Sequence, residues 1–223
     1  ADVILKSYED ASVSEKEVEA LKTYWHGELS HFYVKTPSDE FNNMINVWNA
    51  YQCFITFTWS RAASLLYCGQ RNGYGYRDTV QDIQGVIHQD PEMALEKIRF
   101  MLSAQVDNGA GLPLVKFNHN AGHENTPDDP AYVKETGHPS YRADDALWLF
   151  PTVYKYIAET GNKAFLDEKI VYANGGEDTV YDHLKRAVKF SMDHSGRHGM
   201  PAGLHADWND CLRLGAAGES TFV

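Results

Sequence analysis

The 223-residue sequence predicts an all-α fold, and three features lead to this prediction. Apolar residues recur at helical spacing over long stretches, without a convincing run of strand-type alternation. Nearly apolar helices alternate along the chain with more amphipathic ones. Glycine-rich loops carrying Arg, Asp, His and Trp separate these helices. This order suits a two-layer helical barrel, in which an apolar inner ring lies inside helices with one polar face, although composition alone leaves other helical arrangements open.

The first two predicted elements are a polar helix and a long apolar one. The pattern of residues 12–31 suits a polar lead-in helix that Ser14 can cap. Asp39 is the expected cap of the apolar run 41–67, whose polar interruptions are Asn, Gln, Thr, Ser and one Arg. A helix with so few polar positions is expected to be buried nearly all round.

Three further helical segments follow. Residues 79–106 are helical in pattern, and Pro91 near their middle predicts a break into two helices. An apolar helix is expected over 144–160, with Gly161 at its C-terminal end. The last helix is expected over 179–194. Glycines then make the end of the chain loop-like.

Residues 107–141 are rich in Gly, Pro, Asn, Asp and His and predict a long loop, a length that is often functional. His119, His123 and Glu124 lie close together within it. They lack the helical spacing of metal-binding histidines, so we interpret them as hydrogen-bonding residues and expect no metal.

Composition restricts the class of ligand. The formal net charge of -11 argues against nucleic acid and anionic lipid, which require clustered Lys and Arg. Aromatic residues make up 13% of the chain, and such rings stack on sugars, although most serve the core. The start of the sequence lacks a signal-peptide pattern, no stretch resembles a membrane span, and the three cysteines form no paired motif. A cytoplasmic protein with a neutral ligand is expected.

The segment 71–82 concentrates charge around two glycines and two tyrosines. It contains Arg71, Arg77, Asp78 and Asp82. An arginine can donate two hydrogen bonds in a bidentate arrangement to phosphate or to vicinal hydroxyls. A carboxylate can accept hydrogen bonds from a sugar. A salt-bridge network that stiffens a turn explains the same residues about as well.

A second polar segment, 204–212, packs acids beside an indole. It includes His205, Asp207, Trp208 and Asp210. Burial beside a tryptophan can raise the pKa of a carboxylic acid, which then donates a proton at neutral pH. An Asp/Asn turn before the next helix is an equal alternative.

Two adjacent acids, Asp144 and Asp145, precede the apolar sequence Ala-Leu-Trp-Leu-Phe. Helix capping is the favoured interpretation for at least one of them. The other is free to point elsewhere.

Several long segments resemble glycoside hydrolase family 94, the cellobiose, cellodextrin and chitobiose phosphorylases. They occur in family order and cover almost the whole chain. The matching segments are 46–53 (Asn-Val-Trp-Asn-Ala-Tyr-Gln-Cys), 59–64 (Trp-Ser-Arg-Ala-Ala-Ser), 75–82 (Gly-Tyr-Arg-Asp-Thr-Val-Gln-Asp), 144–149 (Asp-Asp-Ala-Leu-Trp-Leu), 205–210 (His-Ala-Asp-Trp-Asn-Asp) and 218–223 (Gly-Glu-Ser-Thr-Phe-Val).

The resemblance implies an (α/α)6 barrel and a reaction. A β-linked glycosyl unit would be transferred to inorganic phosphate with inversion, giving an α-sugar 1-phosphate without a cofactor. Asp210 is implied as the general acid, with Asp207 as its competitor. The implied sugar pocket comprises Arg61, Arg71, Asp78 and Trp208, and Arg71 also binds phosphate.

The sequence lacks other parts of the family pattern. We expect residues 1–36 to form a linker with the lead-in helix and 37–223 the N-terminal part of the barrel. We expect the family's β-sandwich domain and later barrel helices to belong to a longer polypeptide, so the expected partners are the remainder of that polypeptide and, as in many relatives, a second copy. Without them, the apolar inner ring would be exposed.

The leading prediction is therefore phosphorolysis of a cellobiose-like β-glucosyl disaccharide to α-glucose 1-phosphate and a free sugar. Two alternatives remain. One is a helical-barrel glycoside hydrolase that uses water, and the other is a non-catalytic sugar-binding module.

Overall fold

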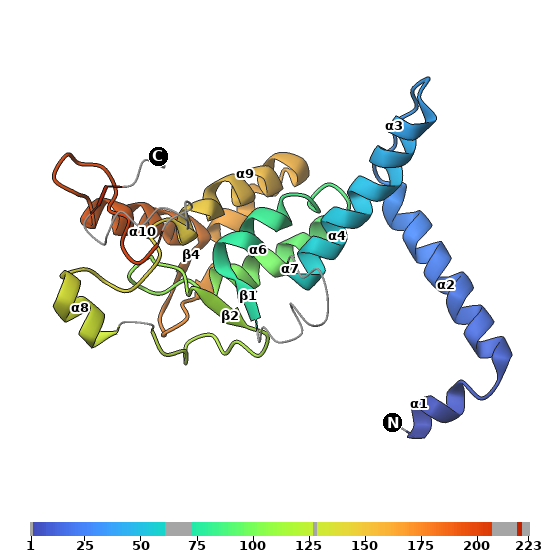
Figure 1. Cartoon of the computed structure of the whole chain (residues 1–223), viewed down its shortest axis with the longest axis horizontal. Helices are drawn as coiled ribbons and strands as arrows, with labels where there is room; N and C mark the ends of the chain where they lie inside the picture. The colour runs from blue at the N-terminus through green and yellow to red at the C-terminus, as the bar shows by residue number, and fades with distance from the viewer. Residues whose placement is uncertain (1, 61–72, 127–128, 207–217, 220–223) are drawn as a thin grey trace.

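The computed structural model describes residues 2–60, 73–126, 129–206 and 218–219. The all-α prediction is confirmed, because helices form most of this part of the chain. Two N-terminal helices project away from a body built around α6, α7, α9 and α10 (Figure 1).

The projecting helices are α1 (Asp2–Ser7) and α2 (Ala11–Leu29). The side chain of Asp10 accepts a hydrogen bond from the backbone N–H of Ser12 and caps α2. The predicted cap, Ser14, is therefore wrong, because the helix begins before that residue. No residue of α2 is buried.

The apolar run begins as α3 (Asp39–Asn43), continues through the π-helical turn η1 (Met44–Asn49) and becomes α4 (Ala50–Trp59). Ser38, rather than the predicted Asp39, is its cap and accepts from the N–H of Phe41. Residues 61–67 of the predicted helix 41–67 lie outside the described residues.

Burial of this run nearly all round is not observed. Phe57 is the buried residue of α4, whereas large apolar side chains before and after it are exposed. The exposed members are Phe41, Met44, Val47, Trp48 and Trp59. These side chains leave an apolar face of the run uncovered.

The body is formed by α6 (Tyr76–Ile83), α7 (Pro91–Leu102), α9 (Leu149–Thr160) and α10 (Val180–Asp193). α6 packs against both α7 and α9, and α7 packs against α9. Each fully buried aliphatic side chain stabilises the fold by about 1.5–3 kcal/mol. The largest fully buried side chains include Tyr76, Ile83, Ile98, Met101, Leu102, Tyr141 and Leu149.

Local signals set the ends of these helices. The predicted break at Pro91 is confirmed: this residue starts α7, and the side chain of Asp90 accepts from the N–H of Met93. The predicted end at Gly161 is also confirmed, because this residue adopts the left-handed conformation after α9. α10 agrees with the predicted helix 179–194 within a residue at each end.

Shorter elements connect the body helices. The strands β1 (Gly73–Gly75) and β2 (Leu114–Lys116) pair antiparallel, as do β3 (Lys169–Val171) and β4 (Glu177–Thr179). A side chain at Gly73 would collide with the backbone of Val115, so glycine permits this close pairing. The predicted loop 107–141 therefore contains β2 and the helix α8 (Pro130–Thr136). The 3₁₀ turns η2 (Asp145–Trp148) and η3 (Lys163–Asp167) flank α9.

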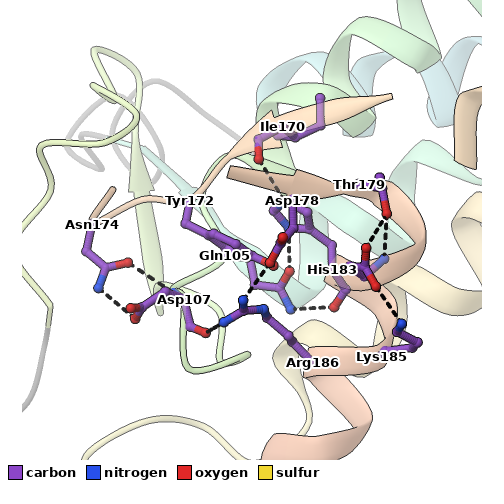
Figure 2. Close-up of polar contacts among 11 residues, drawn as sticks. Gln105, Asp107, Ile170, Tyr172, Asn174, Asp178, Thr179, His183, Lys185 and Arg186 are labelled. Atoms are coloured by element: carbon purple, nitrogen blue, oxygen red, sulfur yellow. Dashed lines mark hydrogen bonds and ion pairs between the residues drawn. The ribbon is translucent and has the colours of Figure 1, made fainter. Parts of the chain in front are cut away.

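A buried polar network ties the β3–β4 hairpin to α10 and to the turn after α7 (Figure 2). Gln105 donates to the carbonyl oxygens of Gly109 at 2.9 Å and of His183 at 3.1 Å. The oxygen of the Gln105 amide lies 2.7 Å from Nδ1 of His183, whose Nε2 lies 3.0 Å from the carbonyl oxygen of Ile170. Gln105 and His183 are fully buried, so these contacts replace those that water would make.

In the described part of the chain, no helix has the length and hydropathy needed to cross a membrane.

Candidate functional site

Of the predicted site residues, Asp78 is the one that the structure describes. Arg61, Arg71, Trp208 and Asp210 lie outside the described residues. The competing acid, Asp207, also lies outside them. The geometry of the site is therefore built from Asp78 and from the segments that lead into the other predicted residues.

Asp78 lies in the first turn of α6, immediately after β1, and is half-buried. A carboxylate is favourable there because the helix dipole is positive at this end. A Cβ atom at Gly75 would lie 3.2 Å from Oδ2 of Asp78, so a glycine leaves room for this carboxylate beside the incoming chain. The described part of the predicted 71–82 segment, residues 73–82, thus forms a strand and a helix that hold Asp78 near their junction.

The next residue toward the N-terminus, Arg77, is buried and paired. Its Nη1 lies 3.4 Å from Oδ1 of Asp144, and both side chains are about 5% exposed. Nε1 of Trp148 donates to Oδ2 of the same carboxylate at 2.9 Å. Part of the first polar segment therefore forms an internal ion pair, the alternative that the sequence left open.

Capping does not explain Asp144. It is the residue before η2, but its side chain makes no capping hydrogen bond. Its carboxylate turns instead to Arg77 and Trp148. The capping interpretation is therefore wrong for Asp144, whose carboxylate pairs with a buried arginine, and for Asp145, whose oxygens accept no hydrogen bond from the described residues.

The second polar segment enters the site beside these acids. The N–H of Ala143 donates to the carbonyl oxygen of Ala206 at 2.8 Å, and that of His205 to Tyr141 at 3.1 Å. Residues 141–143 therefore pair with residues 204–206, directly before the predicted acids. One short segment, 141–145, thus connects the helix carrying Asp78 to the chain that leads into Asp210.

Gly218 and Glu219, the first residues of the segment 218–223, reach the same region. The N–H of Gly203 donates to the carbonyl oxygen of Gly218 at 2.7 Å, and Ala202 forms a bridge with Glu219. The carboxylate of Glu219 lies 2.6 Å from Nδ1 of His198. Segments that are far apart in the printed sequence therefore meet around residues 202–206.

Two strained backbone positions lie shortly before predicted site residues in the sequence. Among the described residues, the non-glycine residues with positive φ are Ser60 at 54° and Leu204 at 50°. Ser60 precedes Arg61, and Leu204 opens the second polar segment. Such conformations cost on the order of 1–3 kcal/mol and cluster at functional sites.

Asp145 is the most unusual titratable group in this region. It is fully buried, and within the described part of the chain neither carboxylate oxygen has a hydrogen-bond partner. Burial raises the pKa of Asp145 to about 8; nearby Arg142 opposes this rise and the neighbouring Asp144 adds to it. The hydroxyl of Tyr76 is also buried and has no hydrogen-bond partner in the described residues.

Sequence reasoning missed the part that Asp144 and Asp145 play here. The sequence pattern that could have indicated it is the pair Asp144 and Asp145, with Trp148 four residues after Asp144. That spacing places an indole N–H within reach of a carboxylate on one helical turn. Capping was preferred because the buried arginine lies 67 residues away in the sequence.

The histidine-rich loop has a structural explanation. Nδ1 of His119 lies 3.1 Å from Oε1 of Glu124, and its Nε2 lies 3.0 Å from the carbonyl oxygen of Ser103. His119 is therefore a hydrogen-bonding residue, as interpreted from the sequence. The expected absence of a metal or cofactor, the homodimer and the cytoplasmic location stay predictions.

Known proteins provide an independent comparison. The chain is 41% identical to N,N'-diacetylchitobiose phosphorylase of Vibrio proteolyticus over 97% of its length. It is 38% identical to the protein of that name from Vibrio furnissii, again over 97% of the chain. It is 31% identical to solabiose phosphorylase of Paenibacillus borealis over 85% of the chain. The chain spans 28%, 28% and 22% of these relatives, respectively.

Residues 24–223 match the family described as the glycosyl hydrolase 94 superfamily, catalytic domain. This match extends over the body helices, the first polar segment and the second one. It also agrees with the all-α fold. The chain therefore belongs to the glycosyl hydrolase 94 superfamily and carries catalytic-domain sequence of that family.

Proposed function

We propose that the chain is part of the catalytic domain of an inverting disaccharide phosphorylase. The enzyme would transfer a β-linked glycosyl unit to inorganic phosphate, giving an α-sugar 1-phosphate and a free sugar. The observation that carries this proposal is the meeting of both polar segments at residues 141–145, through the Arg77–Asp144 pair and the 141–143/204–206 pairing. Family membership and the phosphorylase names of the relatives support the reaction type.

The proposal assigns the proton transfer to Asp210. Its carboxylic acid would protonate the glycosidic oxygen as the bond to the leaving sugar breaks, and Asp207 is the competing candidate. Trp208 would stack on the transferred sugar, while Asp78 would accept hydrogen bonds from its hydroxyl groups. Arg61 and Arg71 would complete the pocket, with Arg71 also binding phosphate.

A single catalytic acid suits phosphate as the nucleophile. An inverting hydrolase needs a second carboxylate, because a water molecule must lose a proton as it attacks. Phosphate is already an anion and requires only positioning, which arginine side chains provide. The proposed pocket has two arginines for this task.

The substrate we place first is N,N'-diacetylchitobiose. The two relatives with that activity in their names are 41% and 38% identical to this chain, whereas a cellobionic acid phosphorylase from Neurospora crassa is 26% identical. The transferred unit would then be N-acetylglucosaminyl. The cellobiose-like glucosyl substrate predicted from the sequence is the second candidate.

The test uses the longest natural polypeptide that contains this chain. Purified enzyme is incubated with N,N'-diacetylchitobiose or cellobiose, with and without inorganic phosphate, and sugar 1-phosphate is measured. We expect phosphate-dependent formation of N-acetylglucosamine 1-phosphate in the α configuration, with cellobiose a poorer substrate. If phosphate-dependent product formed only from cellobiose, as glucose 1-phosphate, the order of the two substrates would be reversed.

The same experiment separates the two alternatives. Sugar release at equal rates with and without phosphate would identify a hydrolase. Binding of N-acetylglucosamine or glucose with no turnover of either disaccharide would favour a sugar-binding module.

A further inference from the structure

Asp145 has a role to explain, because buried polar groups are normally hydrogen-bonded. It is the first residue of η2, its side chain is fully buried, and its two oxygens have no hydrogen-bond partner in the described part of the chain. η2 packs against α6, the helix that carries Arg77 and Asp78. The unpartnered carboxyl group therefore lies against one half of the proposed sugar site.

Charges of both signs act on this carboxyl group. Arg142 and Asp144 lie on its own segment, and Arg77 and Asp78 lie on α6. Arg77 is paired with Asp144. The buried hydroxyl of Tyr76 also responds to Asp145, since burial and then the nearby carboxyl group raise the pKa of Tyr76 well above its usual value.

Burial determines which form of Asp145 is stable. An ionised carboxylate that has left water and accepts no hydrogen bond is strongly disfavoured, whereas the protonated form carries no net charge. Asp78 and Asp144 add repulsion to the ionised form, against attraction from the two arginines. The raised pKa of about 8 agrees with a proton on Asp145 at neutral pH.

We propose that Asp145 is a positioning residue of the sugar site, whose uncharged carboxyl group keeps Arg77 on Asp144 and Asp78 in its place at the start of α6. If the carboxyl group of Asp145 were ionised, it would compete with Asp144 for Arg77 and would repel the carboxylate of Asp78. Asp145 acts through these residues and needs no contact with the sugar. The inference rests on the proposed function, because it assigns Asp78 to sugar binding.

The first test compares kcat/KM for phosphorolysis of N,N'-diacetylchitobiose across a pH series. The proteins are the wild-type polypeptide, D145N, which replaces the acid by an uncharged group of the same shape, and D193N. Asp193 is an exposed carboxylate paired with Lys189 and serves as the matched control. The measured quantity is the ratio of variant to wild type at each pH, because ionisation of phosphate or of the general acid affects both proteins alike.

We expect the D145N ratio to stay within about twofold of one at low pH. Above the pKa of Asp145 the ratio of D145N to wild type should rise about tenfold per pH unit, because the wild type then loses the protonated form of Asp145. The D193N ratio should stay flat. A flat D145N ratio would overturn the positioning role, and so would a D145N protein that fails to fold, because an uncharged isostere should fit the site.

The second test does not depend on turnover. The infrared difference between wild type and D145N should contain the carbonyl band of a protonated carboxylic acid below the pKa and lose it above. Absence of that band at neutral pH would overturn the proposal.

The two tests also separate this proposal from the proposed function. If the wild type converts no disaccharide with phosphate, the phosphorylase function fails. Asp145 is then judged by binding of N-acetylglucosamine and glucose over the same pH series. Weaker binding at high pH in the wild type but not in D145N would support the positioning role, and identical profiles would reject it.

Discussion

Nη1 of Arg77 lies 3.4 Å from Oδ1 of Asp144, in a pair that is almost fully buried and joins residues 67 positions apart. Through this pair, the helix of the first polar segment is tied to the short segment that also pairs with residues 204–206. The described parts of the two polar segments are therefore tied together through residues 141–145. The energetic weight of this link is the first quantity to measure.

Asp144→Ala should destabilise the protein by about 3–5 kcal/mol, because it leaves the guanidinium of Arg77 buried without this partner. Urea denaturation with an unchanged slope would measure the loss. Asp193→Ala breaks an exposed ion pair with Lys189 and should change the free energy of unfolding by less than about 1 kcal/mol. Equal losses in the two variants would show that burial of the Arg77–Asp144 pair is unimportant.

Asp210→Asn should lower phosphorolysis of N,N'-diacetylchitobiose by about 10²–10⁴-fold, because an amide cannot protonate the leaving sugar. An aryl glycoside with an acidic phenol as leaving group needs little protonation. Its phosphorolysis should therefore fall much less in the same variant. Asp207→Asn is the matched control, and a larger loss there would transfer the acid role to Asp207.

Asp145→Asn should alter how stability depends on pH. The pKa of Asp145 is about 8 in the folded chain and about 4 in the unfolded chain, so folding takes up a proton between these values. The resulting stabilisation is complete below about pH 4 and is lost as the pH rises through about 8.

Relative to the wild type, D145N should therefore gain stability as the pH rises from about 4 and level off above about 8, by a total on the order of 3–5 kcal/mol. Urea midpoints measured over this range give the difference directly. A difference that is constant with pH would mean that Asp145 keeps an ordinary pKa in the folded protein.

Gln105→Leu should destabilise the protein by roughly 2–3 kcal/mol. The substitution removes the amide that donates to the carbonyl oxygens of Gly109 and His183 and contacts the imidazole of His183. Asn174→Ala removes two more exposed contacts, both with Asp107, and should have a smaller effect. Chemical denaturation of both variants tests the ranking, and a larger loss for Asn174→Ala would contradict it.

Helix ends were predictable where local stereochemistry decides them. Proline lacks the N–H that a helix interior needs, so Pro91 could only start α7, and Gly161 readily takes the left-handed conformation that ends α9. Capping was less predictable, because Asp10 and Ser14, like Ser38 and Asp39, are chemically able to cap. The two strand pairs were missed because three-residue strands are too short to show alternation.

The sequence by itself determined the all-α class, the main helix limits and, through its ordered segments, the family, because these depend on residue types and spacing along the chain. Only the tertiary structure decided what Asp144 and Asp145 do. Both are acids before an apolar run, yet one faces a buried arginine while the other is buried with no hydrogen-bond donor among the described residues. Burial and partners decide the charge of a carboxyl group, and distant segments supply both.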